Sequence, residues 1–472
     1  MTQQIPVILW FRRDLRLADH RALTAAVHSG RPVIPVFIYD PLTQSLGAAA
    51  KFRLSLSLAA LAADLAGLGS RLILRRGPAL QVLRELAAEL GAREIHWSRL
   101  YDPASKQRDM EVKSALQDAG FAVKSHKGHV LFEPWTVQTQ TGGFYRVFTP
   151  LWKNVRNLDL PACLEAPNAM MPAAHWPVSD DLADWQMEAP MHRGADVLRP
   201  HCCVGERAAA ARLDQFIQKH VANYKANRDL PGVDGTSRLS ENLTYGEISP
   251  LRCWHAGWRA LHEGKADAEV FLKELVWREF AYHLAHHTPE ITSRNWKPVW
   301  DGFPWNEDDT PEVLAWKRGR TGIAFVDAAM REMYVTGTMH NRGRMIVASY
   351  LTKHLMTHWK VGLDWFAQCL IDWDPASNAM GWQWSAGSGP DATPYFRVFN
   401  PVTQLDKFDS GRVYTQRWIA EGQMDPSQTA LAYFDAVPKS WGLSPRDLYP
   451  QPVVDVAVGR KRALAAYENR SF

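Results

Sequence analysis

Cysteine is scarce in this chain, and the cysteines are not spaced as in a disulfide framework. The 472 residues include five cysteines, none in a CxxC pair, at Cys163, Cys202, Cys203, Cys253 and Cys369. The adjacent pair Cys202 and Cys203 suits neither a metal site nor an ordinary disulfide. A disulfide-stabilised secreted domain is therefore excluded, and a reducing cytosol fits this composition.

Long apolar runs are missing as well. No stretch of about 18 apolar residues occurs, so we expect no transmembrane helix. The apolar run at residues 5–11 is short and ends in Arg12 and Arg13. We therefore expect no signal peptide, and a cytoplasmic protein without a membrane partner.

A strong charge of either sign is also missing. The net charge is +4, and residues 206–472 carry 31 Lys and Arg against 31 Asp and Glu. Bulk basicity therefore cannot hold a nucleic acid, and any such contact has to come from a local patch.

Apolar runs alternate with amphipathic stretches over the first 130 residues. The pattern predicts strands at 6–11, 32–39, 71–74 and 94–97, and helices at 21–29, 52–68, 79–90 and 110–119. Alternation at this spacing predicts an α/β domain, residues 1–130, with a Rossmann-like parallel sheet. No GxGxxG follows the first predicted strand, so the dinucleotide fingerprint is absent.

Two further regions follow this domain. Residues 131–205 are rich in proline and poor in periodicity, which predicts a long surface connection between domains. From 206 to 472 the pattern predicts an all-helical domain, with the clearest helices at 208–224, 250–262, 268–287, 323–334, 342–358 and 365–370.

Tryptophan is abundant. Fourteen of the twenty tryptophans lie after residue 250. A core rarely needs so many, because each buried indole N–H requires a partner. Aromatic packing in a large helical domain is one interpretation; stacking on bases or carrying electrons is the other.

The segment 273–280 places several chemical groups on one helical face. Glu274, Trp277 and Arg278 stand at i, i+3 and i+4, so a carboxylate, a flat ring and a guanidinium lie together. This face suits a flat polar heterocycle. The alternative is a Glu–Arg pair that covers an exposed tryptophan.

A second helical face carries Asn341 and Met345, one turn apart. Arg342 points elsewhere, so Arg342 and Arg344 can serve different partners. A solvated helix start is the alternative interpretation.

Residues 372–384 form the richest stretch. If a helix begins at residue 375, Asn378 and Trp382 share a face, whereas Trp382 and Trp384 cannot. No histidine or third carboxylate lies near Asp372 and Asp374, so we expect no metal.

The segment 236–240 combines three hydroxyls with a cation: Thr236, Ser237, Arg238 and Ser240. Hydroxyls and backbone N–H groups at a helix start suit a pyrophosphate. An ordinary N-cap is the alternative.

Five motifs in register resemble the DNA photolyase/cryptochrome family. They are WFRRDLR at 10–16, segments 235–240, 274–280 and 341–345, and WQW at 382–384. The chain looks most similar to bacterial class I photolyases, which act on cyclobutane pyrimidine dimers. The resemblance implies an N-terminal antenna domain, a linker at 131–205, and a helical FAD-binding domain at 206–472. It further implies a monomer that repairs UV-damaged DNA with blue light.

The resemblance also implies individual roles. Implied for FAD binding are Tyr224, Thr236, Ser237, Arg238, Leu239, Ser240, Phe271, Arg278, Arg344, Asp372, Trp373, Asp374 and Asn378. Asn378 would face flavin N5, and Arg344 would pair with Asp372.

Three tryptophans resemble the family's electron path. Trp382, Trp359 and Trp305 would carry electrons from the surface to photo-oxidised FAD. Trp300 and Trp316 stay open as alternative surface ends.

The substrate side matches photolyases for cyclobutane dimers at Glu274, Trp277, Asn341, Met345 and Trp384. The (6-4) photolyases have two histidines where Asn341 and Met345 stand. DASH-type cryptochromes typically have Tyr in place of Trp277. By the same resemblance, Glu274 would hydrogen-bond the base edge of the dimer.

Contacts to the DNA backbone are implied for Arg228, Arg342, Gln404 and Lys407. Plant cryptochromes typically have Asp where Asn378 stands, yet a cryptochrome-type photoreceptor stays an alternative. A flavin-binding module without light chemistry is the other alternative.

The resemblance leaves three alternatives open for a second, antenna chromophore: a folate, a deazaflavin or an empty site. Folate-binding relatives often have Asn-Glu after the fourth strand, where this chain reads YDPASK at 101–106. Deazaflavin-binding relatives often have a lysine near Thr244, which is also missing here.

Overall fold

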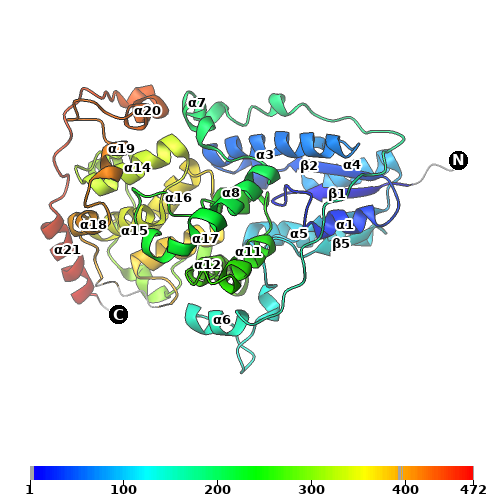
Figure 1. Ribbon diagram of the computed structural model, residues 1–472, viewed down its shortest axis with the longest axis horizontal. Helices are drawn as coiled ribbons and strands as arrows, with labels where there is room; N and C mark the ends of the chain where they lie inside the picture. Colours follow the sequence, from blue (N-terminus) through cyan, green and yellow to red (C-terminus); the bar gives the residue numbers. More distant parts are fainter. Residues whose placement is uncertain (1–4, 392–394, 396, 471–472) are drawn as a thin grey trace.

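The computed structural model describes residues 5–391, 395 and 397–470. Figure 1 shows a sheet-containing part formed by the N-terminal segment and a larger helical part formed by the C-terminal segment. The predicted fold class, a parallel α/β region followed by a helical region, is confirmed.

The sheet has five parallel strands in the order β3-β2-β1-β4-β5. They are β1 (Val7–Phe11), β2 (Val33–Tyr39), β3 (Ile73–Arg76), β4 (Glu94–Ser98) and β5 (Ala122–His126). Val7 of the central strand pairs with Val33 on one side and Glu94 on the other. All five residues of β1 are buried, as expected of a parallel sheet covered on both faces.

Alternate residues of β1 face different helix layers. Val7, Leu9 and Phe11 share a buried cluster with α1 (Arg21–Val27) and α3 (Ala48–Gly67). Ile8 and Trp10 share another with α4 (Ala79–Leu90) and α5 (Pro103–Asp118). This two-residue period fixes which side of the sheet each helix covers.

Two details of this region differ from prediction. The edge strand β5 was missed because its sequence, AVKSH, is mostly polar and partly exposed. Helix α5 starts at Pro103, seven residues before the predicted helix, because Asp102 caps it by accepting from the Ser105 backbone N–H.

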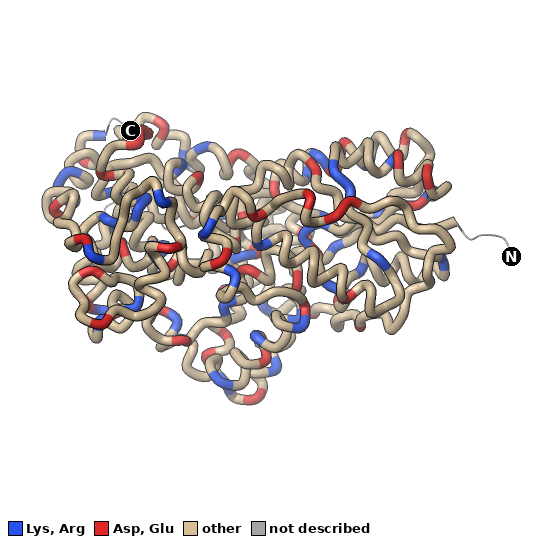
Figure 2. The backbone as a smooth tube through the Cα atoms, turned by 90° about the horizontal axis from the view of Figure 1, so that it is seen from above, with Lys and Arg blue, Asp and Glu red and all other residues tan. Residues whose placement is uncertain are grey.

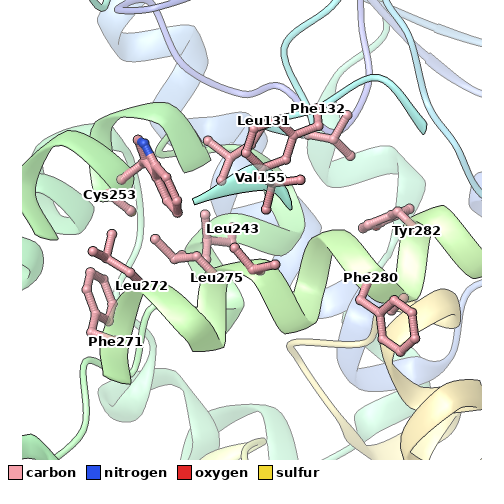
Figure 3. Close-up of a cluster of buried hydrophobic side chains, with 14 of the residues drawn as sticks. Leu131, Phe132, Val155, Leu243, Cys253, Phe271, Leu272, Leu275, Phe280 and Tyr282 are labelled. Carbon is pink, nitrogen blue, oxygen red and sulfur yellow. The ribbon is translucent and has the colours of Figure 1, made fainter. Parts of the chain in front are cut away.

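Residues 131–205 are not simply a surface connection. Leu131, Phe132 and Val155 are buried, and α6 (Phe148–Val155) packs into the helical core. Figure 3 shows these three side chains beside Leu275 and other residues of the same cluster. Prolines interrupt the periodicity here, so the apolar residues are buried without a pattern that predicts it.

The helical part contains nineteen named segments among the described residues, of which three are the 3₁₀ turns η5 (Val221–Asn223), η6 (Pro289–Thr292) and η7 (Pro298–Gly302). The other sixteen follow in chain order. They are α8 (Glu206–Lys219), α9 (Tyr224–Asn227), α10 (Ser240–Tyr245), α11 (Pro250–His262), α12 (Ala268–His287), α13 (Pro311–Lys317), α14 (Ala324–Thr336), α15 (Asn341–Ser349), the π-helical turn η8 (Tyr350–His354), α16 (Trp359–Cys369), α17 (Pro375–Ala386), α18 (Pro401–Phe408), α19 (Val413–Trp418), α20 (Gln428–Ala436), the short turn η9 (Lys439–Trp441) and α21 (Val456–Glu468). Helices α11 and α12 match their predicted bounds, whereas the predicted helix 342–358 is divided between α15 and η8. Helix α12 contacts both α11 and α17, which places it at the centre of this part.

Charge is distributed without a dominant sign along the tube in Figure 2. In the described part of the chain, no helix combines the length and apolarity needed to cross a membrane. The five cysteines are free thiols.

Candidate functional site

A cavity of about 460 Å³ lies between α12, α15 and α17. Its walls include every residue predicted for the dimer pocket: Glu274, Trp277, Asn341, Met345 and Trp384. Residues far apart in the chain are thus brought to one concave surface, which we call the large cavity. Apolar walls with a few polar groups are typical of a site for a flat organic ligand.

A second cavity of about 210 Å³ adjoins it, and we call it the small cavity. Eight predicted cofactor residues line it: Tyr224, Ser237, Leu239, Ser240, Phe271, Arg278, Asp372 and Asp374. Glu274 and Ser377 line both cavities, so a ligand in one lies beside a ligand in the other.

The remaining predicted cofactor residues divide. Arg344 and Asn378 line the large cavity. Thr236, Arg238 and Trp373 are not among the residues that line either cavity. The Arg238 guanidinium lies on an exposed surface, 3.1 Å from the Asp234 carboxylate. It therefore does not line the small cavity as the hydroxyls of Ser237 and Ser240 do.

Helix α12 supplies the central wall. Glu274 and Trp277 reach the large cavity, and Glu274 and Arg278 reach the small one, so the predicted shared face serves both. The Trp277 ring stacks on Phe148 of α6, with centroids 3.7 Å apart and planes 4° apart. Phe148 therefore fixes Trp277 as a rigid plate, with α6 acting as its support.

Arg228, one of the residues predicted to contact the DNA backbone beside the pocket, lies next to Glu274. Its guanidinium forms an ion pair with Glu274 and lies over the Tyr224 ring, 5.6 Å from the centroid. Arg228 also lines the large cavity. It is thus part of the pocket wall and holds the Glu274 carboxylate there.

The other residues predicted to contact the DNA backbone lie outside the cavities. Arg342 binds Asp229 at 2.7 Å and lies over the Phe408 ring at 4.1 Å. Phe408 ends α18, the helix that carries Gln404 and the exposed Lys407. The start of α15 and α18 are therefore neighbours.

The predicted pairing of Arg344 with Asp372 is present in the structure. Arg344 Nη2 lies 3.0 Å from Oδ1 and 2.7 Å from Oδ2 of Asp372, whose side chain is 2% exposed. Arg344 Nε donates to the Met339 carbonyl, which orients the guanidinium. A buried carboxylate needs such a partner, because isolated charge is costly away from water.

Asp374 caps α17 and organises its first turn. Its Oδ1 accepts from the Ser377 N–H at 2.7 Å, and its carbonyl accepts from Asn378 Nδ2 at 2.9 Å. The helix does begin at Pro375, as predicted. Burial favours the neutral carboxyl, but Arg13 and Arg278 outweigh it and lower the pKa of Asp374.

The three predicted tryptophans of the electron path are joined by other residues. The Trp382 ring covers Gly362 so closely that a Cβ there would lie 2.1 Å from its Cη2. Gly362 is one helical turn from Trp359. The His358 ring bridges the next step, with its centroid 5.4 Å from Trp359 and 5.3 Å from Trp305.

The three tryptophans considered as the surface end of the electron path differ in their exposure to solvent. Trp300 is 6% exposed and Trp316 is fully buried, whereas Trp305 is partly exposed. Trp316 contacts Trp382 directly, with centroids 6.1 Å apart, and Trp300 stacks on Trp305.

Ser377, Phe366 and Met380 line the cavities without having been predicted. For Ser377 a signal existed, since an Asp-Pro start places the third helical residue against the cap. Phe366 has no such signal, because only the packing of α16 on α17 brings it to the site.

Two family models match this chain: "DNA photolyase" over residues 7–170 and "FAD binding domain of DNA photolyase" over residues 271–469. The deoxyribodipyrimidine photo-lyase of Agrobacterium fabrum is 44% identical over 467 residues, which cover 98% of this chain and 97% of that relative. The chain belongs to the DNA photolyase family. Cryptochrome-2 of Arabidopsis thaliana is also related, at 33% identity over 96% of this chain and 77% of the relative.

A solved photolyase shares the fold over nearly its whole length. The crystal structure of a bacterial class III photolyase from Agrobacterium tumefaciens matches with a TM-score of 0.91 and 42% identity, covering 99% of this chain and 98% of that one. The likeness to class I photolyases stays a prediction.

Proposed function

We propose that this protein is a deoxyribodipyrimidine photo-lyase that binds FAD and uses blue light to split cyclobutane pyrimidine dimers in UV-damaged DNA. One observation carries the proposal: Trp277, Trp384 and Glu274 wall a cavity that adjoins the predicted cofactor cavity. An electron donor and a dimer bound in these cavities would lie in contact.

The donor set of the small cavity fits FAD. Ser237 and Ser240 offer hydroxyls to a pyrophosphate, and Arg278 offers a cation. Asn378 and the Arg344–Asp372 pair lie where the two cavities meet and would position the flavin ring. When bound in its reduced form, FAD supplies the electron that light excites.

The large cavity fits a dimer flipped out of the helix. Flipping costs a few kcal/mol, least for a damaged pair. Stacking on Trp277 and Trp384 returns roughly 1–3 kcal/mol per base. Glu274, held by Arg228, accepts a hydrogen bond from the base edge and stabilises the reduced dimer.

Backbone contacts would come from Arg342, Gln404 and Lys407, beside the cavity on α15 and α18, and from Arg228 at the cavity wall. Contacts to phosphates supply affinity without reading sequence, which suits an enzyme that acts at any dimer. A local rim of this kind agrees with the neutral charge of residues 206–472.

Electrons would enter at Trp305 and pass through Trp359 to Trp382 at the wall of the large cavity. Of the three candidate surface ends, Trp305 is the one that is partly exposed rather than buried. This exposure favours Trp305 over Trp300 and Trp316.

A second chromophore would fit a third cavity of about 200 Å³ at the end of β4. Trp97, Tyr101 and Trp135 give it flat walls, and Lys106 and Lys113 give it positive charge. This lining suits an acidic aromatic molecule, as folates and deazaflavins are. An absorption spectrum with a band beyond those of FAD would support the assignment.

We also propose the division of the chain that the sequence predicts, namely an antenna domain at 1–130, a linker at 131–205 and a catalytic domain at 206–472. The linker also supports Trp277, because Phe148 of α6 stacks on its ring. A cytoplasmic location accords with the free thiols. A monomer is proposed from the family resemblance.

Repair of a dimer-containing oligonucleotide under blue light tests the function. We expect Glu274→Ala to keep FAD but to lose most of its repair yield per photon. Glu269→Ala is the matched control, since Glu269 lies on the same helix and binds Lys273 away from the cavity. An unchanged yield in Glu274→Ala would exclude the proposed role, and no repair by the wild type would favour a photoreceptor.

A further inference from the structure

Three buried polar groups form a continuous chain that starts at Asp374, on the wall of the small cavity, and leads away from it. His129 follows β5, Tyr282 lies on α12 and Asp374 caps α17; they are 3%, 1% and 6% exposed. The Tyr282 hydroxyl lies 2.8 Å from His129 Nε2 and also contacts Asp374 Oδ2 closely. We call these residues the buried triad.

The hydrogens available to the buried triad do not satisfy its contacts. Arg278 Nη2 lies 3.1 Å from His129 Nε2, and a guanidinium can only donate. Nε2 therefore acts as an acceptor, and its contact with Tyr282 needs the phenol hydrogen. The contact between Tyr282 and Asp374 needs the same hydrogen if the carboxylate is ionised.

One additional proton on His129 or Asp374 would supply the missing hydrogen, but the surrounding charges disfavour protonation of both groups. Burial, Arg278, Arg13 and Arg16 lower the pKa of His129 well below its usual value, so the imidazole is neutral. Arg13 Nη2 also lies 3.4 Å from Asp374 Oδ2 and favours the carboxylate. Two further groups face the triad: the Tyr101 ring stacks at 6.4 Å from His129, and Glu279 pairs with Arg278 at 3.1 Å.

A bound phosphate would alter this balance. Asp374 and Arg278 line the small cavity together with Ser237 and Ser240, the groups suited to the pyrophosphate of FAD. A phosphate anion there would engage the positive charge of Arg278 and raise the proton affinity of Asp374 by like-charge repulsion.

We propose that the buried triad takes up one proton when FAD binds and thereby acts as a set of positioning residues for the cofactor. The inference rests on the FAD site proposed above. A proton from solvent joins the Asp374 carboxylate to give the carboxylic acid, and no electron moves. Asp374 then donates to the Tyr282 oxygen and Tyr282 donates to His129 Nε2, whose single lone pair becomes available to the phenol when Arg278 engages the phosphate.

Binding and protonation are reciprocal. If FAD binding brings in a proton, lowering the pH strengthens FAD binding by about tenfold per pH unit within the window of uptake. A purely structural hydrogen-bond chain would leave the affinity independent of this proton.

Isothermal titration of FAD into the full-length protein freed of cofactor measures the uptake. The heat is compared in buffers of different ionisation enthalpy, which counts protons directly. We expect an uptake approaching one proton for the wild type, which is the most that a single site can take up. His129→Leu removes the competing acceptor, so Tyr282 donates permanently to Asp374 and the uptake falls towards zero.

In a Tyr282→Phe background, the second variant, His129→Leu should no longer change the uptake, because the hydroxyl that links His129 to Asp374 is missing. His96→Leu is the control, because His96 is an equally buried histidine that instead contacts Glu94 in the sheet. Absence of uptake by the wild type, or equal uptake in His129→Leu, overturns the proposal. If the wild type binds no FAD, the cofactor site itself is wrong and the inference falls with it.

Discussion

Gly362 lies inside α16 directly beneath the Trp382 ring, and replacing it with alanine tests both packing and the electron path. In an ordinary helix interior, Gly→Ala stabilises by about 1 kcal/mol through helix propensity. Here the new Cβ would lie 2.1, 2.4 and 2.6 Å from three ring atoms of Trp382. Trp382 is 3% exposed and is held by Phe366, with ring centroids 4.9 Å apart, so it has little room to move.

The expected result follows from these opposing terms. Overpacking a tight core costs typically 1–3 kcal/mol, and contacts this short argue for the upper end. After subtracting the propensity gain, Gly362→Ala should lose about 2 kcal/mol in urea unfolding. The displaced indole should also slow photoreduction of oxidised FAD, while repair by protein with chemically reduced FAD persists.

Gly381→Ala is the matched control for the unfolding measurement, since Gly381 lines the large cavity and is not neutral for the light-dependent assays. Gly381 also lies in a helix, α17, but a Cβ there would meet no atom within 4 Å. We expect Gly381→Ala to gain up to about 1 kcal/mol. The reasoning is refuted if Gly362→Ala is as stable as Gly381→Ala, or if its photoreduction rate equals that of the wild type.

Two further predictions concern buried carboxyls. Arg344→Ala leaves Asp372 buried without the guanidinium whose Nη2 contacts both carboxylate oxygens, and it should cost about 3 kcal/mol of unfolding free energy. This is the lower end for a broken buried pair, because Arg344 is 23% exposed, and Arg344→Lys should restore part of it. Burial, opposed by Arg278, raises the pKa of Glu279 from 4.5 to about 7. The native state then holds this proton more tightly than the unfolded chain, so the stability it supplies is present at low pH and is lost as the pH rises from about 4.5 to about 7. Relative to Glu279→Gln, the wild type should lose up to about 3 kcal/mol over that window, measured by urea unfolding at a series of pH values.

Several features of the site could be predicted from residues close together in the sequence. The face shared by Glu274, Trp277 and Arg278 requires only helical geometry, and α12 has the bounds that its periodicity predicts. The start of α17 at Pro375 follows from Asp-Pro chemistry. The assignment of these faces to FAD and a dimer came from family resemblance, since periodicity alone does not distinguish a ligand wall from ordinary packing.

Other features depend on contacts between distant segments. Arg228 follows a short helical turn, and only the packing of α9 against α12 directs it to Glu274. Residues 131–205 lack periodicity, yet Phe148 supports Trp277 because α6 docks on α12. Strand β5 gave no apolar signal because an edge strand is only half covered.

Sequence alone thus determined the first four strands, the start of α17 and the residues that share one helical face, because those depend on neighbours within a few positions. Only the tertiary structure decided which faces meet. It brought Glu274, Asn341 and Trp384 to one cavity, and it placed His129 and Asp374 on either side of Tyr282. Such encounters depend on how buried surfaces pack across long stretches of chain, and no local pattern carries that information.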